Sequence, residues 1–214
     1  MYIYYPSCNF QKLFPGTAKK VRAYLETQPD VKIAGCCHKT ADAPRAGDVI
    51  VTVCMSCMRG LDEVRADIPS ISLFELLLTR EEFSWPDLRG QAFTLQDCFR
   101  ARGKHDLHRA VRECLVRTGA TVVEMPMNRD EETYDGTFLL HAPYPRNIEE
   151  APRYFGGEVP RFVTPLPEDK WDEYLAEHAK AYTTRRVVGY CNTCVTGARK
   201  GGAEAYHLAE LQFS

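Results

Sequence analysis

Five of the nine cysteines lie in three short clusters, which are Cys8, the adjacent pair Cys36 and Cys37, and the C-x-x-C pair Cys54 and Cys57. Each cluster directly follows a short apolar run of the kind that forms strands. Clustered thiolates are the usual ligands of soft metals and iron–sulfur clusters, and paired thiols also carry out redox exchange. The residue types and their spacing therefore predict a single site built from these five thiols.

Strands and one helix must position these thiols. Apolar runs rich in β-branched and aromatic residues predict strands at Met1–Tyr5, Val31–Gly35 and Val49–Val53. An amphipathic stretch, Thr17–Gln28, predicts a helix between the first two strands. The polar connection from His38 to Gly47 is shorter than a helical crossover and is expected to be a loop. Because the carboxyl ends of parallel strands share one crevice, thiols that follow three such strands can meet.

The sequence also contains an internal repeat. Val51–Leu61 reads VTVCMSCMRGL and Val188–Ala198 reads VGYCNTCVTGA, and both place C-x-[ST]-C-x-x-G after a strand end. Similar amphipathic stretches follow, at Ser72–Leu77 and His207–Gln212. The repeat predicts an α/β fold with two pseudo-repeated lobes, each a small, mainly parallel sheet with flanking helices.

The predicted lobes span residues 1–88 and 89–214. The second is expected to open with a strand at Ala92–Gln96, a helix at Asp106–Thr118 and a strand at Thr121–Met125. A proline-rich insertion at about 137–186 follows, with a helix candidate at Glu168–Tyr182, and is interpreted as a lid, a docking surface or a cover for the sheet.

The site of the second lobe is incomplete, because no cysteine pair follows its second strand. Its remaining thiols are Cys98, Cys191 and Cys194. They could hold zinc or a second cluster, with a fourth ligand from Asp97, Asp135, His207 or water, or they could be buried thiols without a ligand. Cys114 falls on the apolar face of its predicted helix and is expected to be a core residue.

Composition narrows the class of protein. The chain has 214 residues, 44% of them hydrophobic, and a formal net charge of -2 without a basic stripe, which argues against nucleic-acid binding. The sequence has no run long enough to span a membrane and starts with a strand-like run instead of a secretion signal, so we expect a cytoplasmic protein. In a reducing compartment, clustered cysteines favour metal or redox chemistry over structural disulfides.

The order of these motifs resembles the cysteine-rich (CCG) domain family, which includes the cysteine-rich subunit of heterodisulfide reductase and iron–sulfur subunits of glycolate oxidase and lactate utilisation. The resemblance covers nearly the whole chain. The matching pieces are PSC ending at Cys8, GCCH at 35–38, VTVCMSC at 51–57, LQDCFRAR at 95–102, TGATVVEMPMNRD at 118–130 and VVGYCNTC at 187–194. The chain departs from the family at His38, where a glycine is usual, in the short gap before Cys54, and in the missing second cysteine pair.

The resemblance implies an iron–sulfur protein that acts in disulfide reduction or electron transfer, as an oxidoreductase component. It implies a non-cubane [4Fe–4S] cluster held by the five thiols Cys8, Cys36, Cys37, Cys54 and Cys57. The chain has neither a ferredoxin C-x-x-C-x-x-C run nor a glycine-rich dinucleotide motif, so its electrons are expected from a partner, either a ferredoxin-like protein or a flavoprotein subunit. A small disulfide is the corresponding substrate.

The predicted catalytic residues are Cys36, Cys37 and His38. An imidazole titrates near neutral pH, so His38 could protonate a departing thiolate or add a ligand, and it could equally be an exposed loop residue. Two other functions stay open. A zinc-stabilised, non-catalytic interaction module would need four ligands, one fewer than the five thiols available. A metal-free thiol oxidoreductase would use the C-x-x-C pairs but would leave Cys8 unexplained.

Overall fold

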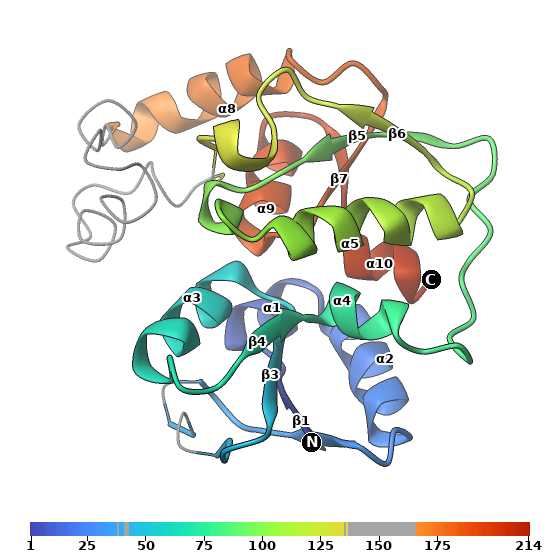
Figure 1. Cartoon of the computed structure of the whole chain (residues 1–214). Helices are drawn as coiled ribbons and strands as arrows, with labels where there is room; N and C mark the ends of the chain where they lie inside the picture. The colour runs from blue at the N-terminus through green and yellow to red at the C-terminus, as the bar shows by residue number, and fades with distance from the viewer. Residues whose placement is uncertain (38, 41–42, 135, 137–165) are drawn as a thin grey trace. The chain divides into compact units, whose positions relative to one another are not determined.

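The computed structural model describes residues 1–37, 39–40, 43–134, 136 and 166–214. The predicted α/β class is confirmed: the chain forms two four-stranded sheets in which all paired strands are parallel, and helices flank both sheets (Figure 1). The two sheets have the same order of strands along the chain, so the predicted repeat is present in the fold.

The first sheet has the order β2-β1-β3-β4. Its strands are β1 (Tyr2–Tyr5), β2 (Val31–Ile33), β3 (Val49–Thr52) and β4 (Ser70–Ser72). Its helices are α1 (Cys8–Leu13), α2 (Pro15–Glu26), α3 (Met55–Val64) and α4 (Leu73–Leu78). The carboxyl ends of β2, β1 and β3 are therefore side by side, and the three cysteine clusters follow them.

The second sheet has the equivalent order β6-β5-β7-β8. Its strands are β5 (Ala92–Gln96), β6 (Thr121–Glu124), β7 (Arg186–Gly189) and β8 (Glu204–His207). The helices of this half of the chain are η1 (Phe99–Ala101), α5 (His105–Arg117), η2 (Arg129–Glu131), η3 (Glu168–Lys170), α8 (Trp171–Ala179), α9 (Asn192–Lys200) and α10 (Leu208–Gln212).

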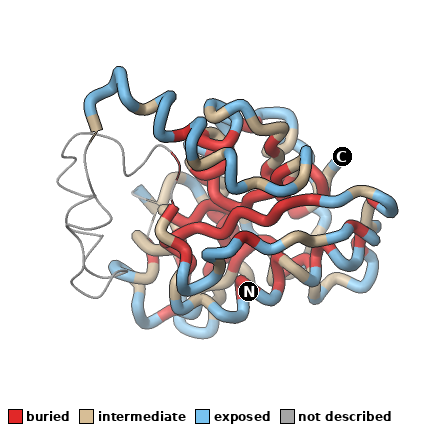
Figure 2. Tube along the Cα trace, turned by 90° about the horizontal axis from the view of Figure 1, so that it is seen from above, coloured by how far each residue is buried: buried red, intermediate tan, exposed pale blue. Residues whose placement is uncertain are grey.

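Apolar strand residues form the cores. Ile3 and Tyr5 of β1 pack with Ile50 of β3, Leu61 of α3 and Ile68, and all five are buried. Buried stretches of the trace alternate with exposed ones (Figure 2). The central strands β1, β3, β5 and β7 are mostly buried, whereas β2 and β6 have no buried residue. Burial of these side chains is the main favourable contribution to folding, and it fixes the sheet edge from which the cysteines project.

The chain divides into two compact units. Unit 1 comprises Met1–Leu88, Asp106–Gly119 and Leu208–Ser214, and unit 2 comprises Arg89–His105 and Ala120–His207. The strands of each sheet come from one predicted half of the chain, but most of α5 and all of α10 group with unit 1.

Two contacts tie these helices into unit 1. The Phe213 ring lies 5.8 Å from the Tyr24 ring and 5.4 Å from the Phe83 ring. Cys114 of α5 is fully buried, as predicted for a core residue, and its thiol donates a hydrogen bond to the Phe74 carbonyl at 3.6 Å. Burial raises the pKa of the Cys114 thiol well above its ordinary value, so it stays protonated.

Several elements differ from the sequence-based expectations, and the helix α1 at Cys8–Leu13 is one that was not predicted. The short strands β4 and β8 were not predicted, because runs such as Ser70–Ser72 have a weak apolar pattern. The helix predicted at Glu168–Tyr182 is η3 followed by the shorter α8. Residues 137–165, the larger part of the predicted insertion, lie outside the described residues.

Within the described ranges, no helix has both the length and the apolar character needed to cross a bilayer.

Candidate metal centre

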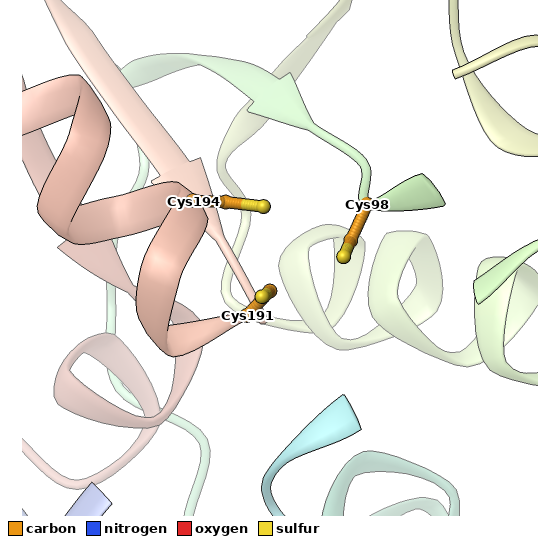
Figure 3. Close-up of side chains that lie close together, drawn as sticks. All are labelled: Cys98, Cys191 and Cys194. Carbon is orange, nitrogen blue, oxygen red and sulfur yellow. The ribbon is translucent and has the colours of Figure 1, made fainter. Parts of the chain in front are cut away.

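Three buried cysteines converge in unit 2. Cys98 follows β5 and Cys191 follows β7, and these two strands are hydrogen-bonded neighbours. The sulfur atoms of Cys98, Cys191 and Cys194 all lie within 4.8 Å of one another. Figure 3 shows the three side chains pointing into a common space. Their exposed fractions are 0%, 4% and 0%. These three cysteines, the thiol triad, therefore form a buried cluster that could bind a metal.

The local fold explains why two of these thiols share a helix end. Cys191 is the N-cap residue of α9, with an extended backbone, and Cys194 lies three residues later in the first turn. Cys54 is likewise the N-cap residue of α3, and Cys57 occupies the position in its first turn that is equivalent to that of Cys194 in α9. The first turn of a helix leaves backbone N–H groups without helical partners, and these favour a negatively charged thiolate.

A hydrogen-bonded carboxylate fixes the two strand ends. The Tyr190 hydroxyl donates to Asp97 Oδ1 at 2.9 Å, and the Arg129 backbone N–H donates to Asp97 Oδ2 at 2.9 Å. Asp97 directly precedes Cys98, and Tyr190 directly precedes Cys191. The side chains of Asp97 and Tyr190 are fully buried, so their bond is shielded from water and holds the two cysteines in register.

The segment Glu132–Tyr134 closes another side of the triad. Glu132 Oε1 accepts the backbone N–H groups of Thr133 and Tyr134 at 2.8 and 2.9 Å, and Gln96 Nε2 donates to Glu132 Oε2 at 2.8 Å. The Tyr134 carbonyl accepts a hydrogen bond from the Cys194 thiol, with a sulfur–oxygen distance of 3.9 Å. Glu132 thereby positions the peptide group that contacts a triad sulfur.

Two glycines permit this closure. Gly136 has a φ of +55°, and a Cβ atom at this position would lie 1.8 Å from the Thr193 carbonyl oxygen. A Cβ atom at Gly197 would lie 2.7 Å from the Gly136 Cα atom. The backbone at Gly136 therefore packs directly on the first turns of α9. This contact gives a steric reason for glycine in the C-x-x-C-x-x-G motif of the second half.

The triad is electrostatically asymmetric. Burial acts to raise the pKa of the Cys191 thiol, but hydrogen bonds from Cys194, Cys98 and the Thr193 hydroxyl outweigh it and hold that pKa well below its ordinary value. Burial raises the pKa of Cys194, and its hydrogen bonds with Cys191 and Cys98 raise it further. The Thr193 hydroxyl lies 3.2 Å from the Cys191 sulfur. Cys191 is therefore the preferred thiolate of the three.

A polar network continues from Glu132 to α8. His178 Nε2 lies 2.8 Å from Gln96 Oε1, and the Tyr182 hydroxyl donates to the same oxygen at 3.1 Å. The His178 ring stacks on the Tyr134 ring with centroids 3.7 Å apart. Burial lowers the pKa of His178 to about 4, so the imidazole is neutral at physiological pH. The network fixes the side chains around the triad, and His178 itself adds no charge to it.

Glu132 is expected to make the stability of unit 2 depend on pH. Burial raises its pKa from the ordinary 4.5 to about 7, although hydrogen bonds from Tyr134 and Thr133 act to lower it. The folded state therefore favours the neutral acid. The resulting contribution of Glu132 to the free energy of unfolding is fully present below pH 4.5 and is lost as the pH rises through about 7. The loss corresponds to about 3 kcal/mol.

Urea unfolding measured across this pH range, in the wild type and in Glu132→Gln, tests this expectation. The wild-type free energy of unfolding should fall as the pH rises, and the variant should show a flatter profile because it lacks the titrating group. Parallel profiles would mean that Glu132 does not titrate in this range.

The five thiols of unit 1 lie in two contacting subsets. The Cys37 and Cys57 sulfurs are 3.5 Å apart. The pKa of the Cys57 thiol is raised, most strongly by its hydrogen bond with Cys37, less by that with Cys54, and also by burial. A hydrogen bond with Cys36 is the largest cause of the raised pKa of Cys8. Cys8 is exposed, Cys54 is buried, and the other three are half-buried.

The adjacent pair is held by its surroundings. The Cys36 carbonyl accepts hydrogen bonds from the backbone N–H and the hydroxyl of Thr40, at 2.9 and 3.1 Å. The Tyr5 hydroxyl donates to the Thr40 carbonyl at 2.6 Å, which ties this turn to β1. Cys37 packs against the core cluster that contains Tyr5. The predicted catalytic residue His38 and the predicted fourth ligand Asp135 lie outside the described residues.

Sequence reasoning named every cysteine of both sets but missed their supporting residues. Among the residues that the structure describes, only the triad forms a group of three or more potential ligands within 4.8 Å of one another. The supporting side chains of Glu132, Gln96 and Thr193 were not singled out, and neither was Gly136. One signal was available, since Gln96 and Asp97 form an uninterrupted polar pair at the end of a buried strand.

Comparisons with known proteins do not assign the chain to a family. No protein-family model and no curated protein matches the sequence. Among solved structures, a periplasmic ribose ABC transporter from Conexibacter woesei is similar at 10% identity, with a TM-score of 0.24. The match covers 94% of this chain and 66% of that one, and its low TM-score gives no basis for an argument about function.

Proposed function

We propose that this chain is an iron–sulfur protein that acts in disulfide reduction or electron transfer, as its resemblance to the CCG domain family implies. In this proposal Cys8, Cys36, Cys37, Cys54 and Cys57 hold a non-cubane [4Fe–4S] cluster. The observation that carries the proposal is the placement of these five thiols. They follow the carboxyl ends of three adjacent parallel strands, and thiols within each of the two subsets contact one another, as in the 3.5 Å Cys37–Cys57 pair.

The donor set fits such a group. Iron–sulfur clusters are held by cysteine thiolates, and all five donors are thiols. A single zinc ion takes four ligands, so it would leave one of these clustered thiols unused. The separation into two contacting subsets also fits a group larger than one ion, because its ligands need not all touch one another. When bound, the cluster would supply single electrons for the reduction of a disulfide.

Residues of unit 1 would prepare the site for this chemistry. Cys54 is the N-cap residue of α3, and the N–H groups in the first turn of a helix favour the thiolate form of a ligand. Cys37 is fixed by packing against the buried β1 residues. Exposure of Cys8 leaves one side open to a sulfur-containing substrate. The second half of the chain has no counterpart of the Cys36–Cys37 pair, so we assign the redox reaction to unit 1 alone.

Partners follow from the same proposal. The sequence has no ferredoxin-type cysteine run and no glycine-rich dinucleotide motif, so a ferredoxin-like protein or a flavoprotein subunit would deliver the electrons. A small disulfide would be the acceptor. The catalytic roles predicted for Cys36, Cys37 and His38 remain part of this proposal, with His38 as the proton donor to the released thiolate.

Metal analysis tests the proposal. The full chain is purified without oxygen, and iron, acid-labile sulfide and zinc per chain are measured together with an EPR spectrum of the reduced protein. About four irons and four sulfides per chain are expected for one cluster. Iron-free protein after anaerobic reconstitution with iron and sulfide would overturn the iron–sulfur function.

A further inference from the structure

The geometry of the thiol triad points to a single metal ion rather than a second cluster. We infer that Cys98, Cys191 and Cys194 bind one zinc ion as three of its four ligands. The inference does not depend on the proposed function of unit 1, because the triad lies entirely in unit 2 and includes none of the five thiols.

Sulfur spacing is the first argument. Zn–S bonds of about 2.3 Å place the sulfurs of a tetrahedral site about 3.8 Å apart. All three triad sulfurs lie within 4.8 Å of one another, so a small contraction brings them to this spacing. In a cubane [4Fe–4S] cluster each thiolate binds a different iron, which sets the sulfurs farther apart than around one shared ion.

The surrounding backbone is the second argument. In the first sheet, Cys36 and Cys37 follow β2, whereas Met125 and Pro126 follow the equivalent strand β6 and bring no thiol. Gly136 packs so closely on the first turn of α9 that a single added carbon would overlap the Thr193 carbonyl. This close packing beside Cys194 suits an ion better than a group of eight atoms.

Ligand spacing and charge are the third argument. C-x-x-C at the start of α9 is a zinc-ligand spacing, and Cys98 adds a third thiolate from a neighbouring strand. Three thiolates and Zn²⁺ leave only one negative charge, so the ion neutralises most of the charge of three buried thiolates. No further His, Cys, Asp or Glu of the described residues meets the triad spacing, so a small ligand such as water would take the fourth position.

Metal content of cysteine variants tests the inference. Cys98→Ser and Cys194→Ser should lose about one zinc per chain and keep their iron. The matched control is Cys114→Ser, another fully buried cysteine whose thiol belongs to neither set, and it should keep its zinc. Cys37→Ser should retain zinc while it loses iron. Loss of iron and sulfide from the triad variants would overturn the inference. An unchanged zinc content in these variants would overturn it as well.

These readings separate the two proposals. An iron-free protein in which only the triad variants lose zinc would refute the proposed function and uphold the zinc site. If the protein holds an iron–sulfur cluster but its zinc content does not depend on the triad cysteines, the proposed function would be upheld and the zinc site refuted. Zinc lost equally from the triad variants and the Cys114→Ser control would identify a nonspecifically bound ion and overturn the inference.

Cobalt substitution covers the case in which the triad variants fail to fold. Zinc is removed by a chelator from folded Cys37→Ser protein, whose five-thiol set is broken, and Co²⁺ is added. Thiolate-to-cobalt charge-transfer bands and the intense visible bands of tetrahedral cobalt are expected, and added zinc should bleach them. The weak spectrum of octahedral cobalt would contradict a three-thiolate site.

Discussion

Replacing Gly136 by alanine is expected to abolish metal binding at the triad and to destabilise unit 2 by more than about 3 kcal/mol. The added Cβ atom would lie 1.8 Å from the Thr193 carbonyl oxygen and 2.8 Å from the Cys194 backbone nitrogen. Both neighbours are backbone atoms in the first turn of α9, so they cannot move aside without displacing Cys194. The φ of +55° adds a conformational cost for any L-residue with a side chain.

Gly103→Ala is the matched control. Gly103 also belongs to unit 2 and also has a positive φ, +75°, but a Cβ atom there meets nothing within 4 Å. This variant should lose only about 1 kcal/mol and keep its metal. Zinc content and urea unfolding, the latter followed by tryptophan fluorescence, provide the two readouts. Equal losses in the two variants would show that backbone conformation, and not the close approach to α9, makes glycine necessary at Gly136.

Cys37→Ser is expected to remove the visible absorbance of the anaerobic protein completely while leaving a soluble, folded chain. The Cys37 sulfur contacts Cys57 at 3.5 Å and would lose its place as a soft ligand, because a serine hydroxyl is a harder and far less acidic donor. The substitution changes one atom on a half-buried residue, so the core around Ile3 and Tyr5 should persist.

Absorbance, iron content and circular dichroism are compared for Cys37→Ser, the wild type and Cys114→Ser. The control should keep the chromophore, because the Cys114 thiol hydrogen-bonds to the Phe74 carbonyl and to no other cysteine in the described structure. An unchanged spectrum in Cys37→Ser would remove this residue from the proposed ligand set. An equal loss in both variants would indicate general destabilisation.

The strands that bear the cysteines could be predicted because they are short and strongly apolar. Val49–Thr52 and Ala92–Gln96 need no tertiary information, since their composition and length already exclude a helix. The prediction that thiols after neighbouring strands lie close together followed from the rule that the carboxyl ends of parallel strands share one crevice. The strands β4 and β8 were missed because Ser70–Ser72 and Glu204–His207 mix polar with apolar residues, and pairing with a neighbouring strand decides their conformation.

The surroundings of the triad could not be predicted in the same way. Glu132 and Tyr134 meet residues of β5 and α9 that are 36 and 60 positions away in the chain. Their roles depend on a backbone turn that brings a carbonyl to Cys194, and a single sequence carries no periodic signal for such a turn. The glycine of the C-x-x-C-x-x-G motif was visible, but its reason, the close approach of Gly136, appears only in the folded chain.

The composition of unit 1 also has a consequence for biosynthesis. Its four strands are translated within the first 72 residues, so the sheet that carries the five thiols can begin to form early on the ribosome. The same unit is completed by Leu208–Ser214, whose Phe213 joins the aromatic contacts of Tyr24 and Phe83. The segment Leu208–Ser214 must therefore leave the ribosome before this unit is whole, so its closure follows the synthesis of the strands of the second sheet.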